Sequence, residues 1–380
     1  MKITELIRLD KEFKDFSQCL FDTYKKREPL PIVVNGLSGG ASSAFLTEAV
    51  KDAVSIADEP VLILVGDDAE RSAVASSLLS AGLDAVEYKP RDYVFYNISA
   101  SHDLDRERLE VLYSIAEGGK GRVIVTTPAA ALAFTMPKDE LLDRALAVKL
   151  GDEISPETIA EKLVLMGFSA VESVESRGQF ARRGGIVDFF GADMELPCRL
   201  EFFGDEVDRI ASFDPLTQRT EDSQDSVRLI PAREIIPTKS SRERMLKEVR
   251  AALRSDKISE EIRARLEREK NALESGVDIN FADKYISLVY ENNSCLFDYF
   301  KGEKSPIIFI SGTSVCLDNA KKYIEKLNSA RAAMISSGAL ATASMQYSAS
   351  LGSYESFTES SLTVHVNSFA FSLNQNRLRQ

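Results

Sequence analysis

The chain has 380 residues, of which 44% are hydrophobic and 28% are charged, and its formal net charge at pH 7 is -12. This length exceeds what one ordinary hydrophobic core holds, so we expect two or three domains. The acidic balance disfavours general binding to nucleic acid phosphates, although it does not exclude a local basic patch. Residues 1–4 lead into charge and no run of eighteen apolar residues follows, so we expect a cytoplasmic protein that is neither secreted nor inserted in a membrane.

Histidine and cysteine are used sparingly. The two histidines, His102 and His365, are too few for a metal-ligand cluster or a His-based catalytic triad. The cysteines are isolated from one another and lie mostly in apolar or strand-like surroundings, and we expect them to be reduced core thiols: Cys19, Cys198, Cys295 and Cys316. The residue types therefore predict neither a catalytic site nor a metal site.

Residues 1–150 alternate short apolar segments with helical ones. The expected strands are 31–35, 61–65 and 122–127, and the expected helices are 5–27, 41–50, 69–80 and 105–116. Near-continuous apolar strands between helices are typical of a parallel sheet that helices cover on both faces. We therefore predict an α/β fold in which residues 1–150 form the first half of a nucleotide-binding-like domain.

A glycine loop follows the first expected strand, at the place where a phosphate-binding P-loop would lie. A P-loop needs a glycine, four further residues, then Gly-Lys-Ser/Thr, because the lysine neutralises the phosphates and the hydroxyl holds magnesium. Here Gly36 is followed at the last three positions by Ala41, Ser42 and Ser43, so a hydroxyl is kept and the lysine is missing. We predict a degenerate loop that is kept for its turn geometry and binds no cofactor.

The pattern changes after residue 150. Ser155, Pro156 and Glu157 form a typical helix start, with a hydroxyl cap, a proline in the first turn and an early acid. The segments that follow have period two, and the expected strands are 171–176, 185–190, 198–203 and 206–213. These features predict an inserted α+β domain with an antiparallel sheet over residues 151–237.

Residues 238–328 are expected to complete the first domain. The polar stretch 239–270 is interpreted as one exposed helical region with opposite charges, in preference to a nucleic acid contact. The aromatic side chains of 281–300 are interpreted as packing. The apolar strand 306–310 ends in Ser311-Gly312, where a nucleotide-hydrolysing sheet commonly carries Asp-Glu.

Two separate losses therefore point the same way. The lysine is missing from the glycine loop and the acids are missing after strand 306–310, which together indicate a hydrolase scaffold without its chemistry. A last helix is expected at 315–327. The Ser/Ala-rich end at 329–380 is assigned no element, and a linker is one interpretation of it.

The stretch from Arg177 to Phe190 concentrates arginine, glycine and phenylalanine in an acidic protein. Arginine presents a planar fork that suits carboxylates, and an adjacent aromatic ring supplies apolar area, which is a common composition of interface hot spots. The alternative is that these arginines solvate a loop and pair with neighbours such as Glu172 and Glu175. For Gly184-Gly185 we prefer a structural role, a bulge or a tight entry into the next strand.

Three segments carry a resemblance to a known family. The sequence RGQFARRGGIVDFF at 177–190, LEFFGDEVDRI at 200–210 and FDPLTQR at 213–219 is similar to the module shared by the bacterial excision-repair protein UvrB and the transcription-repair coupling factors. The degenerate glycine loop and the aromatic segment 285–300 resemble the coupling factors more than UvrB. The stretch near 88–101, where UvrB carries a DNA-gripping hairpin, looks too short for one.

This resemblance implies a degenerate RecA-like sheet with an inserted domain that binds UvrA. The family pattern Arg-Gly-x-Phe-x-x-Arg-Gly falls here with Arg177, Phe180 and Arg183 at its partner-binding positions. The resemblance further implies a non-catalytic adaptor, the N-terminal fragment of a longer protein that recruits UvrA to stalled RNA polymerase in transcription-coupled nucleotide excision repair.

In such a protein, RNA polymerase and DNA bind to domains absent from this chain, and ATP and magnesium serve a motor further along. The alternative is an ATP-dependent DNA enzyme, or a UvrB-like damage-binding protein, in which the loop at Gly36 is an active nucleotide site.

Overall fold

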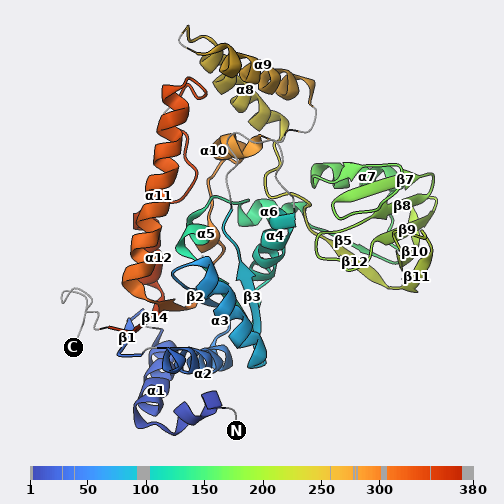
Figure 1. The fold of residues 1–380 in the computed structure, drawn as a ribbon. Helices are drawn as coiled ribbons and strands as arrows, with labels where there is room; N and C mark the ends of the chain where they lie inside the picture. Colours follow the sequence, from blue (N-terminus) through green and yellow to red (C-terminus); the bar gives the residue numbers. More distant parts are fainter. Residues whose placement is uncertain are drawn as a thin grey trace.

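The computed structural model describes residues 3–369, apart from residues 28, 38, 92–102, 257, 277–278, 280, 301–305 and 343. A parallel sheet with helices on both faces forms the body of the molecule, and an antiparallel domain lies beside it (Figure 1). The helices α8 (Lys239–Leu253) and α9 (Glu260–Ser275) lie at one end of the long helix α11 (Thr313–Ser336), and the chain's N-terminus lies toward the other end (Figure 1). The α/β fold with an inserted α+β domain is confirmed.

The parallel sheet has six strands. In spatial order they are β1 (Ile32–Asn35), β14 (Leu362–Asn367), β13 (Ile307–Ser311), β2 (Val61–Leu64), β4 (Arg122–Thr126) and β3 (Asp84–Tyr88). Every adjacent pair is parallel. Strands β2 and β13 are buried along almost their whole length, as expected for the middle of a sheet with two covered faces.

Two of these strands were not predicted. Strand β14 lies within the Ser/Ala-rich end, between β1 and β13, so interpreting residues 329–380 as a linker is wrong as far as residue 367. Its apolar residues alternate with Thr363, His365 and Asn367, which are buried as well. A buried strand with several polar residues lacks the continuous apolar run from which such a strand is predicted. The other unpredicted strand, β3, carries charged residues because it lies at the sheet edge.

Helices cover the two faces of this sheet with two separate cores. The first core lies against η1 (Ile3–Leu9), α1 (Lys11–Lys26), α2 (Gly40–Ile56) and α3 (Asp68–Ser80). The second lies against α4 (Asp103–Ala116), α5 (Pro128–Leu132), α6 (Lys138–Arg144), α11 (Thr313–Ser336) and α12 (Leu351–Ser360). The predicted helix 5–27 is divided, because the Asp10 side chain accepts from two backbone amides and starts a new helix there.

The inserted domain contains a six-stranded sheet, a two-stranded sheet and one helix. The larger sheet has the order β11 (Thr220–Ser223), β10 (Glu206–Phe213), β9 (Cys198–Phe203), β8 (Ile186–Phe189), β7 (Gln179–Arg183) and β6 (Ser169–Ala170). Helix α7 (Pro156–Leu165) packs on it, and β5 (Leu146–Lys149) pairs with β12 (Ser226–Leu229). The predicted strand 171–176 is wrong, since the strand in this region is β7.

The polar region 239–270 is two helices and not one. Helix α8 (Lys239–Leu253) begins at the Thr238 cap, and α9 (Glu260–Ser275) begins at the Ser259 cap. The two helices lie side by side as a hairpin (Figure 1). They are joined to the second core through η2 (Ala282–Tyr285), α10 (Ile286–Val289) and η3 (Leu296–Phe300). The prediction that the aromatic side chains of 281–300 are packing residues is confirmed.

Three of the four cysteines are buried as predicted, whereas Cys19 on α1 is exposed. Burial raises the pKa of the Cys198 thiol to about 12, which keeps it protonated and unreactive. Across the described ranges, no helix is long and apolar enough to cross a membrane, and no group of three or more His, Cys, Asp or Glu residues is placed to hold a metal. The stretch expected to be too short for a DNA-gripping hairpin lies largely outside the described residues.

Candidate partner-binding surface

The arginine- and glycine-rich stretch folds into a β-hairpin. Strands β7 and β8 are antiparallel, and Arg183 pairs with Ile186 across the two-residue turn Gly184-Gly185. Gly184 has a φ of +60°, and a Cβ on Gly185 would lie 3.1 Å from the Phe202 carbonyl oxygen. Only glycine meets both requirements without strain, so these residues have the structural role that the sequence indicated.

The two faces of the inserted sheet have different environments. One face packs on α7 through a core that contains Phe180, Val187 and Phe189. Side chains alternate along a strand, so Arg183 and Asp188 lie on the opposite face. Arg182 returns to the α7 side, where it pairs with Glu157 of that helix.

Phe180 therefore does not contribute to an exposed surface. Its relative exposure is 4%, because its position in β7 directs the ring toward α7. The prediction that it supplies apolar contact area to a partner is wrong for this reason. Its role is to hold β7 against the helix, which fixes the position of the arginine three residues later.

Asp188 binds two arginines on the face away from α7. Its side chain is 1% exposed; Arg183 Nη2 lies 2.7 Å from Oδ2, and Arg199 Nε lies 2.7 Å from Oδ1. Arg199 also lies over the Phe213 ring, with its guanidinium carbon 4.7 Å from the ring centroid. These hydrogen bonds raise the pKa of Arg199. The side chain of Arg183 is 52% exposed, so its guanidinium is oriented by the buried Asp188 carboxylate and is still open to solvent.

Neighbouring strands extend this surface in register. Glu201 of β9 pairs across the sheet with Ile186 on one side and Arg209 on the other, and Arg209 Nη1 lies 3.2 Å from Glu201 Oε1. Phe203 follows on the same side of β9 and is 80% exposed. We name this surface the arginine face and define it by Arg183, Ile186, Arg199, Glu201, Phe203 and Arg209.

Arg177 lies elsewhere, at the opposite end of β7 from Arg183. It lies in the turn that precedes β7, whereas Arg183 is the last residue of that strand. The Arg177 guanidinium donates to the Met194 carbonyl oxygen at 3.0 and 2.8 Å and lies over the Phe190 ring. Arg177 also lies near Arg106 of α4. The pKa of Arg106 is lowered mainly by its burial and to a smaller extent by the positive charge of Arg177. The alternative interpretation, in which these arginines pair with Glu172 or Glu175, finds no such pair among the described ion pairs.

Of the residues that define the arginine face, sequence reasoning assigned a role to Arg183 alone. Glu201, Phe203 and Arg209 lie in the segment 200–210, which carries the family resemblance, and Arg199 directly precedes it. The available signal was the alternation of charged and apolar residues from Cys198 to Phe203, which places Arg199, Glu201 and Phe203 on one side.

The glycine loop has the predicted position between β1 and α2. Gly36 and Gly39 have φ values of +87° and +54°, and the N-cap residue of α2 is Gly39, which has no side chain. Ala41, Ser42 and Ser43 lie in the first turn of that helix and contribute no cation.

The carboxyl ends of β2 and β13 are joined by internal hydrogen bonds. Glu70 accepts from Ser311 Oγ at 2.6 Å and from the Gly66 amide at 3.0 Å. Asn319 donates to the Gly66 carbonyl oxygen at 2.8 Å. The carboxylate of Glu70 on α3 therefore ties the end of β13 to the turn that follows β2.

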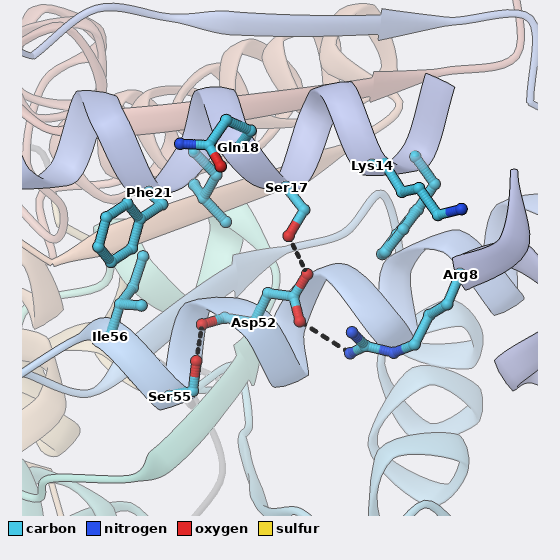
Figure 2. A pocket seen from close by; sticks show the side chains of 10 residues that line it. Arg8, Lys14, Ser17, Gln18, Phe21, Asp52, Ser55 and Ile56 are labelled. Carbon is cyan, nitrogen blue, oxygen red and sulfur yellow. Dashed lines mark hydrogen bonds and ion pairs between the residues drawn. The ribbon is translucent and has the colours of Figure 1, made fainter. Parts of the chain in front are cut away.

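A separate hollow of about 460 Å³ lies between α1 and α2. Figure 2 shows Asp52 at its centre, bonded to Ser17 and Arg8. Glu48 also pairs with Arg8 and with Lys51. Because these charges already satisfy one another, we interpret the hollow as the seam where the N-terminal helix packs on the domain.

The inserted domain matches a known family model. Residues 146–235 match the family model described as the UvrB interaction domain. This range begins at β5 and ends just after β12, so it contains the whole arginine face. The predicted boundaries of 151–237 omit β5, which was assigned to the preceding domain.

Most of the chain is similar to transcription-repair-coupling factors. That of Bacillus subtilis (strain 168) is 27% identical over 308 residues, covering 78% of this chain and 25% of that protein. The one from Myxococcus xanthus is 30% identical over 231 residues, covering 60% of this chain and 19% of that protein. For Staphylococcus aureus (strain USA300) the identity is 26% over 318 residues, with 81% and 26% covered.

The chain thus spans about a quarter or less of the length of these relatives. The matches cover both the parallel sheet and the inserted domain, since the longest extends over about four-fifths of the chain. The resemblance predicted from the sequence, to the UvrB-like module of the transcription-repair coupling factors, is confirmed.

Proposed function

We propose that this chain is a non-catalytic docking module that recruits the repair protein UvrA through the arginine face of its inserted domain. The observation that carries the proposal is the pair of arginines on Asp188, which lies within the residues that match the UvrB interaction domain. The relatives couple transcription to repair, as their names say. By this proposal, the present chain supplies the contact to the repair machinery.

The geometry of the arginine face suits a protein partner with surface carboxylates. Arg183 is held by Asp188 and needs little further ordering, so a bidentate bond to a partner carboxylate costs less conformational entropy than it would for a free side chain. Phe203 offers an exposed aromatic ring on the same side. Arginine and aromatic residues together are the residues that most often dominate interface energies.

The remaining activities of a coupling factor are assigned by this proposal to other parts of a longer protein. RNA polymerase binding, DNA translocation and the use of ATP and magnesium belong to the three-quarters of the relatives that this chain does not match. The missing lysine in the glycine loop and the missing acids after β13 support an adaptor over an ATP-dependent enzyme.

A matched pair of variants tests the docking surface. Arg183→Gln removes a charge from the arginine face and leaves Asp188 bonded to Arg199. Arg182→Gln removes the adjacent charge on the opposite face of the same strand, where it pairs with Glu157. In titration calorimetry with UvrA of the same organism, we expect the first change to weaken binding at least tenfold, about 1.4 kcal/mol. The second should change binding less than twofold.

Thermal unfolding of both variants controls for loss of structure, and both transitions should stay near that of the parent chain, since both side chains are exposed. Equal UvrA affinity for Arg183→Gln and the parent would remove the arginine face as the docking surface. A parent chain that fails to bind UvrA at all would reject the proposed function itself.

A further inference from the structure

A short loop lies beside the arginine face at the end of β10. We call it the tip loop and define it as residues 214–219, which follow β10. Leu216 at its apex is 93% exposed, the highest value among the large apolar side chains of the described residues. A single exposed leucine is common on protein surfaces, so exposure alone says little. The way in which the loop holds this leucine is informative.

Backbone hydrogen bonds fix the shape of the tip loop. Asp214 Oδ1 accepts from the amides of Leu216 at 2.7 Å and Thr217 at 2.9 Å. The Gln218 amide donates to the Asp214 carbonyl oxygen at 2.8 Å, and the Asp214 amide donates to the Arg219 carbonyl oxygen at 3.0 Å. Pro215 fixes a further torsion angle. Leu216 is therefore presented by a closed turn, and a flexible loop would not present it this way.

Gln218 is held in an unfavourable conformation at the base of this turn. Its φ is +60°, a value that non-glycine residues rarely adopt. Its side-chain amide donates to the carbonyl oxygens of Pro215 at 2.8 Å and Val174 at 3.2 Å, which tie the loop to itself and to a neighbouring segment. Such strain persists only where the surroundings impose it, and it concentrates at functional positions.

The tip loop is joined directly to the arginine face. Arg199 Nη1 donates to the Gln218 carbonyl oxygen at 3.3 Å, while the same guanidinium binds Asp188. The loop leaves β10 after Phe213, at the opposite end of that strand from the turn beside Phe203. The basic surface therefore has an exposed apolar side chain at each end, Phe203 at one and Leu216 at the other.

We propose that the tip loop is a second anchor for the same protein partner, with Leu216 entering an apolar recess on UvrA next to the carboxylates that meet Arg183 and Arg199. This inference rests on the proposed function and extends its contact surface. The chemistry it requires of the partner is an apolar depression bordered by acidic groups, because Arg199 of β9 donates to the loop at Gln218 and Arg219 is the last residue of the loop. Pre-ordering of the loop lowers the entropy cost of inserting Leu216.

Two truncations of exposed leucines form the test. Leu216→Ala shortens the apex of the tip loop, and Leu165→Ala shortens a leucine that is 65% exposed on α7, at the opposite face of the sheet. With the full chain and purified UvrA in titration calorimetry, we expect Leu216→Ala to weaken binding at least fivefold and Leu165→Ala to change it less than twofold.

A further variant separates the leucine from the shape of its loop. Gln218→Gly keeps Leu216, relieves the positive φ and removes the side-chain bonds to Val174 and Pro215. We expect it to weaken UvrA binding severalfold without lowering the thermal transition. Unchanged affinity in Leu216→Ala, while Arg183→Gln still loses binding, would overturn the tip loop and leave the docking function standing. Loss of UvrA binding by the parent chain would overturn both.

Discussion

Glu234 and Arg108 form an ion pair that is wholly buried, with Glu234 Oε2 2.8 Å from Arg108 Nε and Oε1 2.9 Å from Arg108 Nη2. Glu234 follows the last strand of the inserted domain, whereas Arg108 belongs to α4 beside the parallel sheet. Burial lowers the pKa of Arg108, but the Glu234 carboxylate outweighs it and the net shift is upward. This pair fixes the returning chain of the inserted domain to the body of the molecule.

Other buried charges surround the same carboxylate. Arg91 Nη1 lies 2.7 Å from Glu234 Oε2 and 2.8 Å from Asp105 Oδ1, and Arg91 Nη2 lies 2.7 Å from Asp283 Oδ1. Burial raises the pKa of Asp283, and the cation of Arg91 opposes that shift. Removing Glu234 takes from the buried Arg108 the carboxylate that it pairs with, while Arg91 keeps Asp105 and Asp283.

We therefore predict that Glu234→Ala lowers the free energy of unfolding by about 3–5 kcal/mol, as for other broken buried pairs. Urea unfolding followed by circular dichroism measures this change. Glu117→Ala is the control, since its pair with Arg228 also joins the two domains but is 46% exposed on both sides, and its loss should cost less than about 1 kcal/mol. Similar losses for the two variants would contradict a special role of the buried pair.

The second prediction concerns pH and His365 in β14. Burial lowers the pKa of His365 to about 4 from the ordinary value of 6.5, and Nδ1 lies 3.0 Å from the Thr313 hydroxyl. In the unfolded chain the imidazole of His365 takes up a proton as the pH falls below 6.5, whereas in the folded chain it stays neutral until the pH is near 4. The stabilising contribution is therefore complete above pH 6.5 and is lost as pH falls toward 4.

At pH 5 the expected loss from this residue is about 2 kcal/mol of unfolding free energy. Urea titrations at pH 7, 6 and 5 should show a steeper decline for the parent chain than for His365→Gln, which cannot titrate. The comparison of slopes is needed because carboxylates begin to protonate in the same range. Parallel pH profiles for the two chains would show that His365 is not the group responsible.

The third prediction concerns nucleotide binding. The glycine loop offers Ala41, Ser42 and Ser43 where a P-loop has its glycine, lysine and hydroxyl, and β13 is followed by no Asp-Glu pair. We expect titration calorimetry with ATP and magnesium to give no heat of binding in the micromolar range, and phosphate release to stay at the background rate. Saturable binding with turnover would favour the alternative of an ATP-dependent DNA enzyme. A Ser42→Lys variant would not restore turnover by itself, because the Asp-Glu pair expected after strand 306–310 is missing as well.

Local patterns were sufficient for much of the fold. The apolar runs at 61–65 and 306–310 gave two central strands because those segments are buried on both faces. The Ser155 cap and Pro156 fixed the start of α7 to the residue, since capping depends on a few adjacent side chains. The aromatic side chains of 281–300 are core residues, as the scarcity of basic residues around them predicts.

The sequence by itself determined that Arg183 lies in a motif that resembles the family pattern and that the glycine loop lacks the lysine of a P-loop, because both depend on residue identity. Only the tertiary structure decided that Phe180 is buried, that Arg199 shares Asp188 with Arg183, and that β14 completes the sheet. The physical reason is that strand register and side-chain alternation are set by pairing between distant segments. A shift of one residue in that pairing would exchange the two faces, and no local pattern records it.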